Sequence, residues 1–407
     1  MMRARILPLL LVLGCGTSAP PAPRDVSPKA PVATPPSVTP APAPAPASRP
    51  ALVAEAEAAA QRGADYIAAK TRRDGKLVYL INLDPEADVP RKYNVLRHAG
   101  ALYALGQVHS QWPSPERAAA LGRSLRYFQD RYLRPVADTG DQYAVWSHGE
   151  DDEAKLGGAG LALVALTQHR PPHGEPEALE GLVRFIARLQ KDDGSFYSKF
   201  YAGRGPDDSW TSLYYPGEAA LGLLRLHATA PEIAVGAVET ATRALMFLAE
   251  SRKEAKRIPP DHWALIATAD RLALGGLSPG EEAALLRHAG QVIDVMLTQP
   301  DFPSGAPQRG SFRADGRTTP TATRLEGILA MRPHLEDASR IAAVDAAVPP
   351  AIRFLLRAQV RTGPHRGAVP KALREDADPR HTEVRIDYVQ HAVSAWLAYA
   401  ALETPPE

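Results

Sequence analysis

Six segments of this chain are apolar on almost every side yet begin with polar residues, and this pattern limits the available folds more than any other. They recur at intervals of about 45 to 65 residues. A helix that is apolar all round has to be covered on every side by other parts of the protein. The six segments begin at residues 93 (YNVLRHAGALYALGQVH), 156 (LGGAGLALVALTQHR), 214 (YYPGEAALGLLRLHA), 260 (PDHWALIATADRLAL), 321 (TATRLEGILAMRPHL) and 387 (DYVQHAVSAWLAYAAL).

A second kind of predicted helix alternates with the first and has one charged face. In PERAAALGRSLRYFQDRYL, for example, apolar residues recur at three- and four-residue spacing, as in a helix with one solvated side. Ser278, Pro279 and Glu281 supply a capping serine, a proline at the first helical position and a glutamate at the third. Pro349 and Pro350 predict that the last such helix begins at them, after a shorter helix. We expect these outer helices at residues 51–70, 115–133, 177–190, 232–251, 279–299 and in a last segment that ends near 360.

Six outer and six inner helices in strict alternation predict an all-α fold, an (α/α)6 toroid whose inner helices line a central cavity. Two links between an outer and an inner helix, DGKLVY at 74–79 and DGSFY at 193–197, are similar to the Asp-Gly-x-aromatic links of the six-hairpin glycosidase-like proteins. The resemblance covers residues 51 to about 402 and implies this fold. It is a resemblance of architecture without a family-specific catalytic motif, so it assigns no catalytic residue.

The N-terminal 50 residues predict export and a membrane anchor. Residues 1–14 combine a basic start with an apolar run and read as a signal peptide. Leu13-Gly14-Cys15 resembles the lipobox of bacterial lipoproteins, which implies cleavage before Cys15, acylation of its thiol and a lipid anchor at the cell envelope. The alternatives are an ordinary secretory signal and an uncleaved span, for which the apolar run is short against roughly 20 residues. Residues 16–50 hold 12 prolines, so 15–50 reads as an extended tether before a toroid domain at 51–407.

Composition excludes several kinds of function. The formal net charge is +1 and the basic residues are scattered, which argues against a nucleic-acid partner. Cys15 is the only cysteine, so the toroid domain has neither disulfides nor a thiolate for catalysis or zinc binding. The histidines are dispersed without HExxH spacing and no phosphate-binding glycine loop is present, so we expect neither a metal nor a cofactor.

The functional site is expected where the long links deliver the chain to the inner helices. Long loops on one end of a scaffold usually build its site, and helix N-termini favour anions. Aromatic rings stack on the apolar face of a sugar, carboxylates bind hydroxyls or act as acid and base, and arginines pair with acidic substituents. We therefore predict catalytic roles for Glu218, Asp261, Asp387 and His391, and substrate binding by Tyr93, Asn94, Arg97, His98, Tyr215, His262, Trp263, Arg324, Arg385 and Tyr388.

Two of these predictions have structural alternatives. Asp387 lies four residues before His391 and could orient its imidazole, but aspartate is favoured at any helix start. Arg97 and Arg324 either bind an acidic group of the substrate or pair with Glu218 or Glu326 inside the barrel. Likewise, the acidic run at 150–153 either supplies a catalytic carboxylate or is a solvated loop. Glu218 and Asp261 are stronger candidates, because a charge without a partner is costly in an otherwise apolar helix.

These features lead first to an exported enzyme that hydrolyses an acidic polysaccharide or oligosaccharide with paired carboxylates. A lyase or uronate epimerase in the same fold is the near alternative and would give Tyr215, His98 and the arginines the leading roles. A toroid that only binds a glycan or a partner protein is a third hypothesis. A lipid-chain cyclase is weaker, since only 6% of residues are aromatic.

Overall fold

The computed structural model describes residues 48–137, 139–147, 152–374 and 378–403. The predicted signal peptide, Cys15, most of the predicted tether, and Glu150 and Asp151 of the acidic run lie outside these residues. The described residues belong to one unit of the chain, Ala47–Glu407. Within them, no helix is long and apolar enough to span a membrane.

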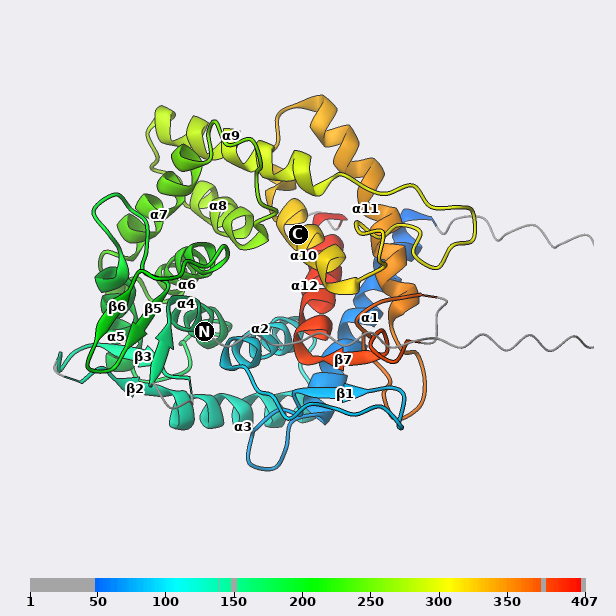
Figure 1. Cartoon of the computed structure of the whole chain (residues 1–407), viewed down its shortest axis with the longest axis horizontal. Helices are drawn as coiled ribbons and strands as arrows, with labels where there is room; N and C mark the ends of the chain where they lie inside the picture. Colours follow the sequence, from blue (N-terminus) through cyan, green and yellow to red (C-terminus); the bar gives the residue numbers. More distant parts are fainter. Residues whose placement is uncertain (1–47, 138, 148–151, 375–377, 404–407) are drawn as a thin grey trace, which may run out of the picture. The chain divides into compact units, whose positions relative to one another are not determined.

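Twelve α-helices in the described residues alternate between an outer and an inner position (Figure 1). Each inner helix packs against two other inner helices, in the closed order α2, α4, α6, α8, α10, α12 and back to α2. This arrangement is an (α/α)6 toroid, as the alternation predicted. The outer helices are α1 (Arg49–Ala69), α3 (Pro115–Tyr132), α5 (Pro176–Leu189), α7 (Ala237–Ser251), α9 (Pro279–Met296) and α11 (Ala338–Ala358). The inner helices are α2 (Val95–Gln111), α4 (Leu156–Leu166), α6 (Tyr215–Thr229), α8 (His262–Leu274), α10 (Thr318–Met331) and α12 (Ile386–Glu403).

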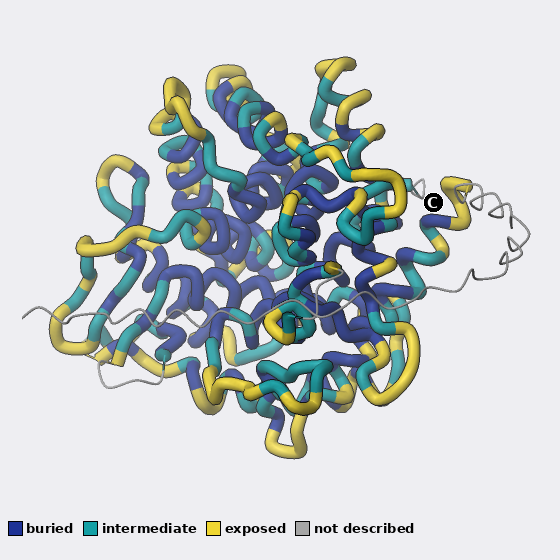
Figure 2. Tube along the Cα trace, turned by 45° about the vertical axis from the view of Figure 1, so that its right-hand side comes forward, coloured by how far each residue is buried: buried dark blue, intermediate teal, exposed yellow. Residues whose placement is uncertain are grey.

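Burial follows the two sequence patterns (Figure 2). All eleven residues of α4 are buried, as expected for a helix that is apolar all round. Small residues bring the inner helices close together. A Cβ on Gly160 of α4 would overlap the carbonyl group of Glu218 in α6, and a Cβ on Gly222 would overlap the carbonyl of Gly160. The polar groups that start the inner helices are therefore held on a tightly packed ring.

Short antiparallel strands occupy the links that lead into inner helices. β1 (Leu80–Asn82) pairs with β7 (Glu383–Arg385), with Leu80 opposite Arg385, and so joins the first link to the last. β2 (Leu133–Pro135) pairs with β3 (Tyr143–Val145). β4 (Glu153–Lys155), β5 (Lys199–Tyr201) and β6 (Gly205–Asp207) form a sheet in that order. These pairings fix the long links on the end of the toroid where the inner helices begin.

The prediction that the last outer helix begins at the two prolines is wrong. α11 runs without a break from Ala338 to Ala358 and contains Pro349 and Pro350. Val344 and Val348 before the prolines and Ile352 after them are all buried, so the same face packs on the ring throughout. This packing outweighs the cost of two missing backbone donors.

Candidate active site

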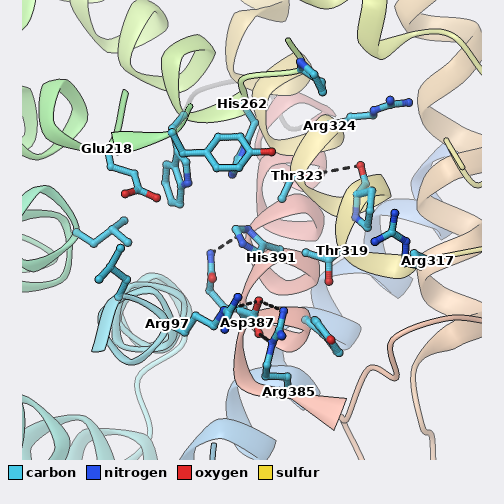
Figure 3. Close-up of a pocket in the computed structure, with 18 of the residues that line it drawn as sticks. Arg97, Glu218, His262, Arg317, Thr319, Thr323, Arg324, Arg385, Asp387 and His391 are labelled. Atoms are coloured by element: carbon cyan, nitrogen blue, oxygen red, sulfur yellow. Dashed lines mark hydrogen bonds and ion pairs between the residues drawn. The ribbon is translucent and has the colours of Figure 1, made fainter. Parts of the chain in front are cut away.

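A cavity of about 610 Å³ opens where the inner helices begin, and all six contribute to its lining (Figure 3). Eleven of the fourteen predicted site residues line it. They are Asn94, Arg97, Tyr215, Glu218, His262, Trp263, Arg324, Arg385, Asp387, Tyr388 and His391. Tyr93, His98 and Asp261 do not.

The central imidazole of the cavity belongs to His391 on α12. Its Nδ1 lies 2.8 Å from Oε1 of Glu326 on α10, and Glu326 is only 3% exposed. Burial raises the pKa of Glu326, and the neighbouring His391 partly opposes that shift. The same Nδ1 lies 3.1 Å from Nε2 of Gln390. In the tautomer whose Nδ1–H donates to Glu326, Nε2 is the nitrogen that can accept a proton from a substrate.

The predicted pairing of Asp387 with His391 is wrong, because two arginines hold Asp387. Its Oδ1 accepts from Nε of Arg385 at 2.5 Å, and its Oδ2 lies 3.1 Å from Nε of Arg97. Neither Arg97 nor Arg324 pairs with Glu218 or Glu326. Arg97 pairs with Asp387, and Arg324 donates to the backbone carbonyl of Phe312, which precedes α10. Asp387 thus neutralises part of the charge of these two arginines, and its interactions with them fix its position.

Glu218 is the one lining carboxyl group without such a partner. It is 6% exposed, and its Oε2 has no hydrogen-bond partner among the described residues. Burial, with a smaller contribution from the charge of Asp261, raises the pKa of Glu218 well above its ordinary value. This shift favours the protonated form of the group, which can donate a hydrogen bond or a proton to a ligand.

His262 on α8 is the second imidazole of the cavity. It is 3% exposed, and neither ring nitrogen has a hydrogen-bond partner in the described part of the chain. Its ring centroid lies 5.4 Å from that of His391 and 5.4 Å from that of Tyr214. Burial, reinforced by His391, lowers the pKa of His262 well below 6.5, so the ring is neutral at pH 7.

A close approach at Gly157 of α4 fixes the position of Glu218. A Cβ at this glycine would overlap Oε2 of Glu218 and the ring of Tyr215. Gly157→Ala is therefore expected to lower the free energy of unfolding by about 1–3 kcal/mol and to displace the carboxyl group. Denaturant unfolding of the chain measures the stability change. Gly122→Ala on α3, where the nearest atom would be 3.6 Å away, is the matched control and should be neutral or stabilising. Equal effects of the two changes would contradict this role of Gly157.

Asp261 is a structural residue rather than the catalytic one we predicted. It caps α8, with Oδ1 accepting from the backbone N–H of Ala264 at 3.2 Å. Its Oδ2 accepts from Nη1 and Nη2 of Arg252 at 3.1 and 3.2 Å, and its side chain is fully buried. Both oxygens of Asp261 thus accept hydrogen bonds from the protein itself, and the residue does not line the cavity.

The predicted substrate contacts of Tyr93 and His98 are also wrong. His98 is fully buried, with Nδ1 2.6 Å from the hydroxyl of Tyr93 and Nε2 2.9 Å from Oγ of Ser124. Its ring stacks on Tyr127 of the outer helix α3. Burial lowers the pKa of His98 to about 3, so it is a neutral ring that joins an inner to an outer helix.

Sequence reasoning missed several residues that line the cavity. Tyr214 and Thr323 lie at helix starts that the polar pattern had marked. Others lie on the long links or near the starts of α10 and α12, and no spacing rule shows which way a loop side chain points. These are Arg313, Arg317, Thr319, Lys371 and Gln390. Among the described residues, no group of three or more His, Cys, Asp or Glu side chains is arranged to hold a metal ion.

The closed ring of inner helices makes the chain an (α/α)6 toroid, a fold that it shares with several solved structures. Solved structures with this fold include a D-mannose isomerase, with a TM-score of 0.64 and 12% identity over 86% of this chain and 99% of the other. Cellobiose 2-epimerase from Spirochaeta thermophila has a TM-score of 0.59 and 14% identity over 87% and 98%. An α-1,6-mannanase from a Salegentibacter species has a TM-score of 0.56 and 11% identity over 85% and 99%. No protein-family model and no curated protein matches the sequence.

Proposed function

We propose that this protein is a carbohydrate-active enzyme that isomerises or epimerises a sugar by proton transfer. The observation that carries the proposal is the pair of imidazoles in the cavity. His391 is held by a buried carboxylate, and the unpartnered His262 lies 5.4 Å from it between ring centroids. Two imidazoles that reach one substrate can remove a proton at one position and return it at another.

The proposed reaction uses the open-chain form of the sugar, which has a carbonyl group. Nε2 of one imidazole takes the proton from the carbon next to the carbonyl, and the electron pair of that C–H bond moves toward the carbonyl oxygen. Glu218, whose raised pKa favours its protonated form, donates a hydrogen bond to the oxygen on which negative charge develops. Return of the proton to the same carbon of the resulting enediolate, on the other face, gives an epimer. For an isomer, the hydroxyl proton on that carbon moves to the former carbonyl oxygen and the neighbouring carbon takes up the proton from the imidazole.

Two further observations support a sugar as the substrate. A cavity of about 610 Å³ is within the usual range for small-molecule sites. Its lining combines the rings of Tyr214, Tyr215 and Trp263 with carboxyl groups and arginines, a mixture suited to a polyhydroxylated ring. The fold is also that of proteins named D-mannose isomerase and cellobiose 2-epimerase.

Glycoside hydrolysis, our first hypothesis from sequence, is the second candidate. Glu218, with its raised pKa and its unpartnered Oε2, has the properties of a general acid, and an α-1,6-mannanase shares the fold. Hydrolysis also requires a second carboxylate that acts as a base or a nucleophile. The predicted partner Asp261 does not line the cavity, and Asp387 is bound by two arginines. The site is therefore better suited to proton transfer.

Proton NMR in D2O separates these reactions in one experiment. The chain would be incubated with D-mannose, D-glucose, cellobiose, α-1,6-mannotriose and D-glucuronate. Loss of a ring-proton signal by exchange, together with signals of a new sugar, is the expected result. New reducing-end signals would instead establish hydrolysis, and vinyl signals a lyase. Unchanged sugars whose lines broaden would favour a toroid that only binds glycans, and would overturn the proposal for these sugars.

We also propose that the protein is exported and anchored in the bacterial cell envelope through a lipid on Cys15. The support is the lipobox-like Leu13-Gly14-Cys15 and the proline-rich sequence after it. Cys15→Ser in the full chain is expected to abolish incorporation of labelled palmitate and to move the protein from the membrane to the soluble fraction. Labelling and fractionation unchanged in this variant would contradict the anchor.

A further inference from the structure

We propose that the substrate carries an anionic substituent, bound at a cationic wall formed by Arg313, Arg317 and Lys371. This inference rests on the proposed function, because it names the substrate class of the same site. The shared chemistry is a group of negatively charged oxygens, such as a phosphate or a carboxylate.

Charge is distributed unevenly over the described residues that line the cavity. Two of them are acidic, Glu218 and Asp387. Asp315, Glu326 and Glu383 contact lining residues, and the cationic residues outnumber the carboxyl groups even when all three are counted. Six lining residues are cationic, namely Arg97, Arg313, Arg317, Arg324, Lys371 and Arg385.

Three of the six cations are already engaged by the protein. Arg97 and Arg385 share the carboxylate of Asp387, at 3.1 and 2.5 Å. Arg324 donates to the carbonyl oxygen of Phe312 at 2.9 Å. These interactions fix the three side chains and reduce what they can offer to a ligand. The arginines that we had expected to bind an acidic group, Arg97 and Arg324, are both among them.

In the cationic wall, by contrast, the positive charges outnumber the carboxylates that contact them. Arg313 and Arg317 share the single carboxylate of Asp315, at 3.8 and 2.8 Å, and their side chains are 47% and 43% exposed. Lys371 contacts no carboxylate among the described residues. Three cations against one carboxylate leave two positive charges facing the cavity. Arginine forks match the oxygens of phosphate and carboxylate groups, and lysine adds a point charge.

The wall is assembled at the first turn of α10 by contacts between two distant links. The backbone N–H of Thr318 donates to the carbonyl oxygen of Lys371 at 3.0 Å, and its Oγ1 donates to that of Pro370 at 2.6 Å. Arg317 is also bridged to Ala372. These bonds hold Lys371 beside the start of α10, where the helix dipole adds to the attraction for an anion.

Arg317 of the wall lies on the side of the cavity opposite Glu218. In Figure 3, Arg317 and Thr319 lie on one side, Glu218 lies on the opposite side, and His391 lies between them. Buried polar atoms without partners, on Glu218 and His262, also point to a ligand in this cavity. A sugar whose carbonyl end reaches His391 would thus extend its far end toward Arg317. Specificity for a charged far end follows from this arrangement.

Isothermal titration of the full chain at low salt tests the inference. The probes are D-glucose 6-phosphate, D-glucuronate, D-glucose and inorganic phosphate. At least one anionic sugar is expected to bind at least about tenfold more tightly than glucose, since hydrogen bonds to charged groups are strong. It should also bind more tightly than inorganic phosphate, because the rest of the cavity holds the sugar. Whether the phosphate or the carboxylate binds more tightly identifies the anionic group.

The double variant Arg313→Gln/Arg317→Gln should remove this preference, bringing the anionic sugar to within about twofold of glucose. Arg361→Gln is the matched control, because Arg361 pairs with Glu55 on the outer surface at 2.6 Å. It should leave the preference intact. Equal affinity of the wild-type chain for charged and neutral sugars would overturn the inference, and so would a preference that the double variant retains. A sugar phosphate that binds no better than inorganic phosphate would also overturn it.

The same probes separate this inference from the proposed reaction. Exchange of ring protons in neutral sugars, without any preference for anions, would overturn the inference of an anionic substrate. It would still support the proposed proton transfer. Selective binding of anionic sugars without exchange would support the ligand class and overturn the reaction.

Discussion

His391→Asn is expected to lower kcat for proton exchange on the sugar by about 10² to 10⁴-fold, the usual contribution of a general acid or base. Asparagine can keep a hydrogen bond to Glu326 but cannot accept and return a proton near neutral pH. The rate at which deuterium replaces a ring proton, followed by NMR in D2O, measures the effect. Circular dichroism should be unchanged, because the side chain faces a cavity rather than the packed ring.

Two further variants decide whether the loss reflects proton transfer. His169→Asn removes an imidazole that contacts His109 and His173, outside the cavity lining, and should leave kcat unchanged. Glu326→Gln keeps a hydrogen-bonding group beside His391 but removes the charge, so we expect a smaller loss and an altered pH profile of kcat. Full exchange activity in His391→Asn would exclude this residue as the acid or base. New reducing-end signals in that variant would then favour hydrolysis with Glu218.

The fold was predictable because its periodicity is strong and local. An apolar helix such as α4 has to be inside, and a helix with one charged face has to be outside, so the order of the two kinds defines the toroid. The wrong prediction at Pro349 and Pro350 has a different origin. The local rule against proline in a helix was outweighed by tertiary packing of Val348 and Ile352 on the same face.

The location of the site was predictable, but the partnerships within it were not. The polar starts of the inner helices marked eleven residues that line the cavity. The contacts that define their roles, such as Glu326 with His391, join residues 65 positions apart on different helices. Sequence spacing on one helix suggested Asp387 instead, since it cannot reveal which neighbouring helix supplies the nearer group. The same limit made Asp261, a helix cap, resemble a catalytic carboxylate.

Asp261→Ala is expected to destabilise the fold by about 3–5 kcal/mol, the cost of breaking a buried ion pair. The change would leave Arg252, whose side chain is 12% exposed, without its carboxylate and would remove the cap of α8. Denaturant unfolding measures the loss. Glu218→Gln provides the contrast, because that buried carboxyl group has no ionic partner and its raised pKa favours the uncharged form. An uncharged amide should therefore change stability by less than about 1 kcal/mol.

A double-mutant cycle tests whether Asp261, unlike Glu218, stabilises the fold through an ion pair. If Asp261 acts through Arg252, then Arg252→Ala alone should also be strongly destabilising, and the double variant should cost much less than the sum of the two. For activity the expected order is reversed, so the variant of Glu218 should lose more than the variant of Asp261. The folded fraction of Asp261→Ala should retain proton exchange, whereas Glu218→Gln should lose part of it. Of these two residues, only Glu218 lines the cavity. Additive stability losses, or an inactive but fully stable Asp261→Ala, would return Asp261 to the catalytic role that its place in the sequence suggested.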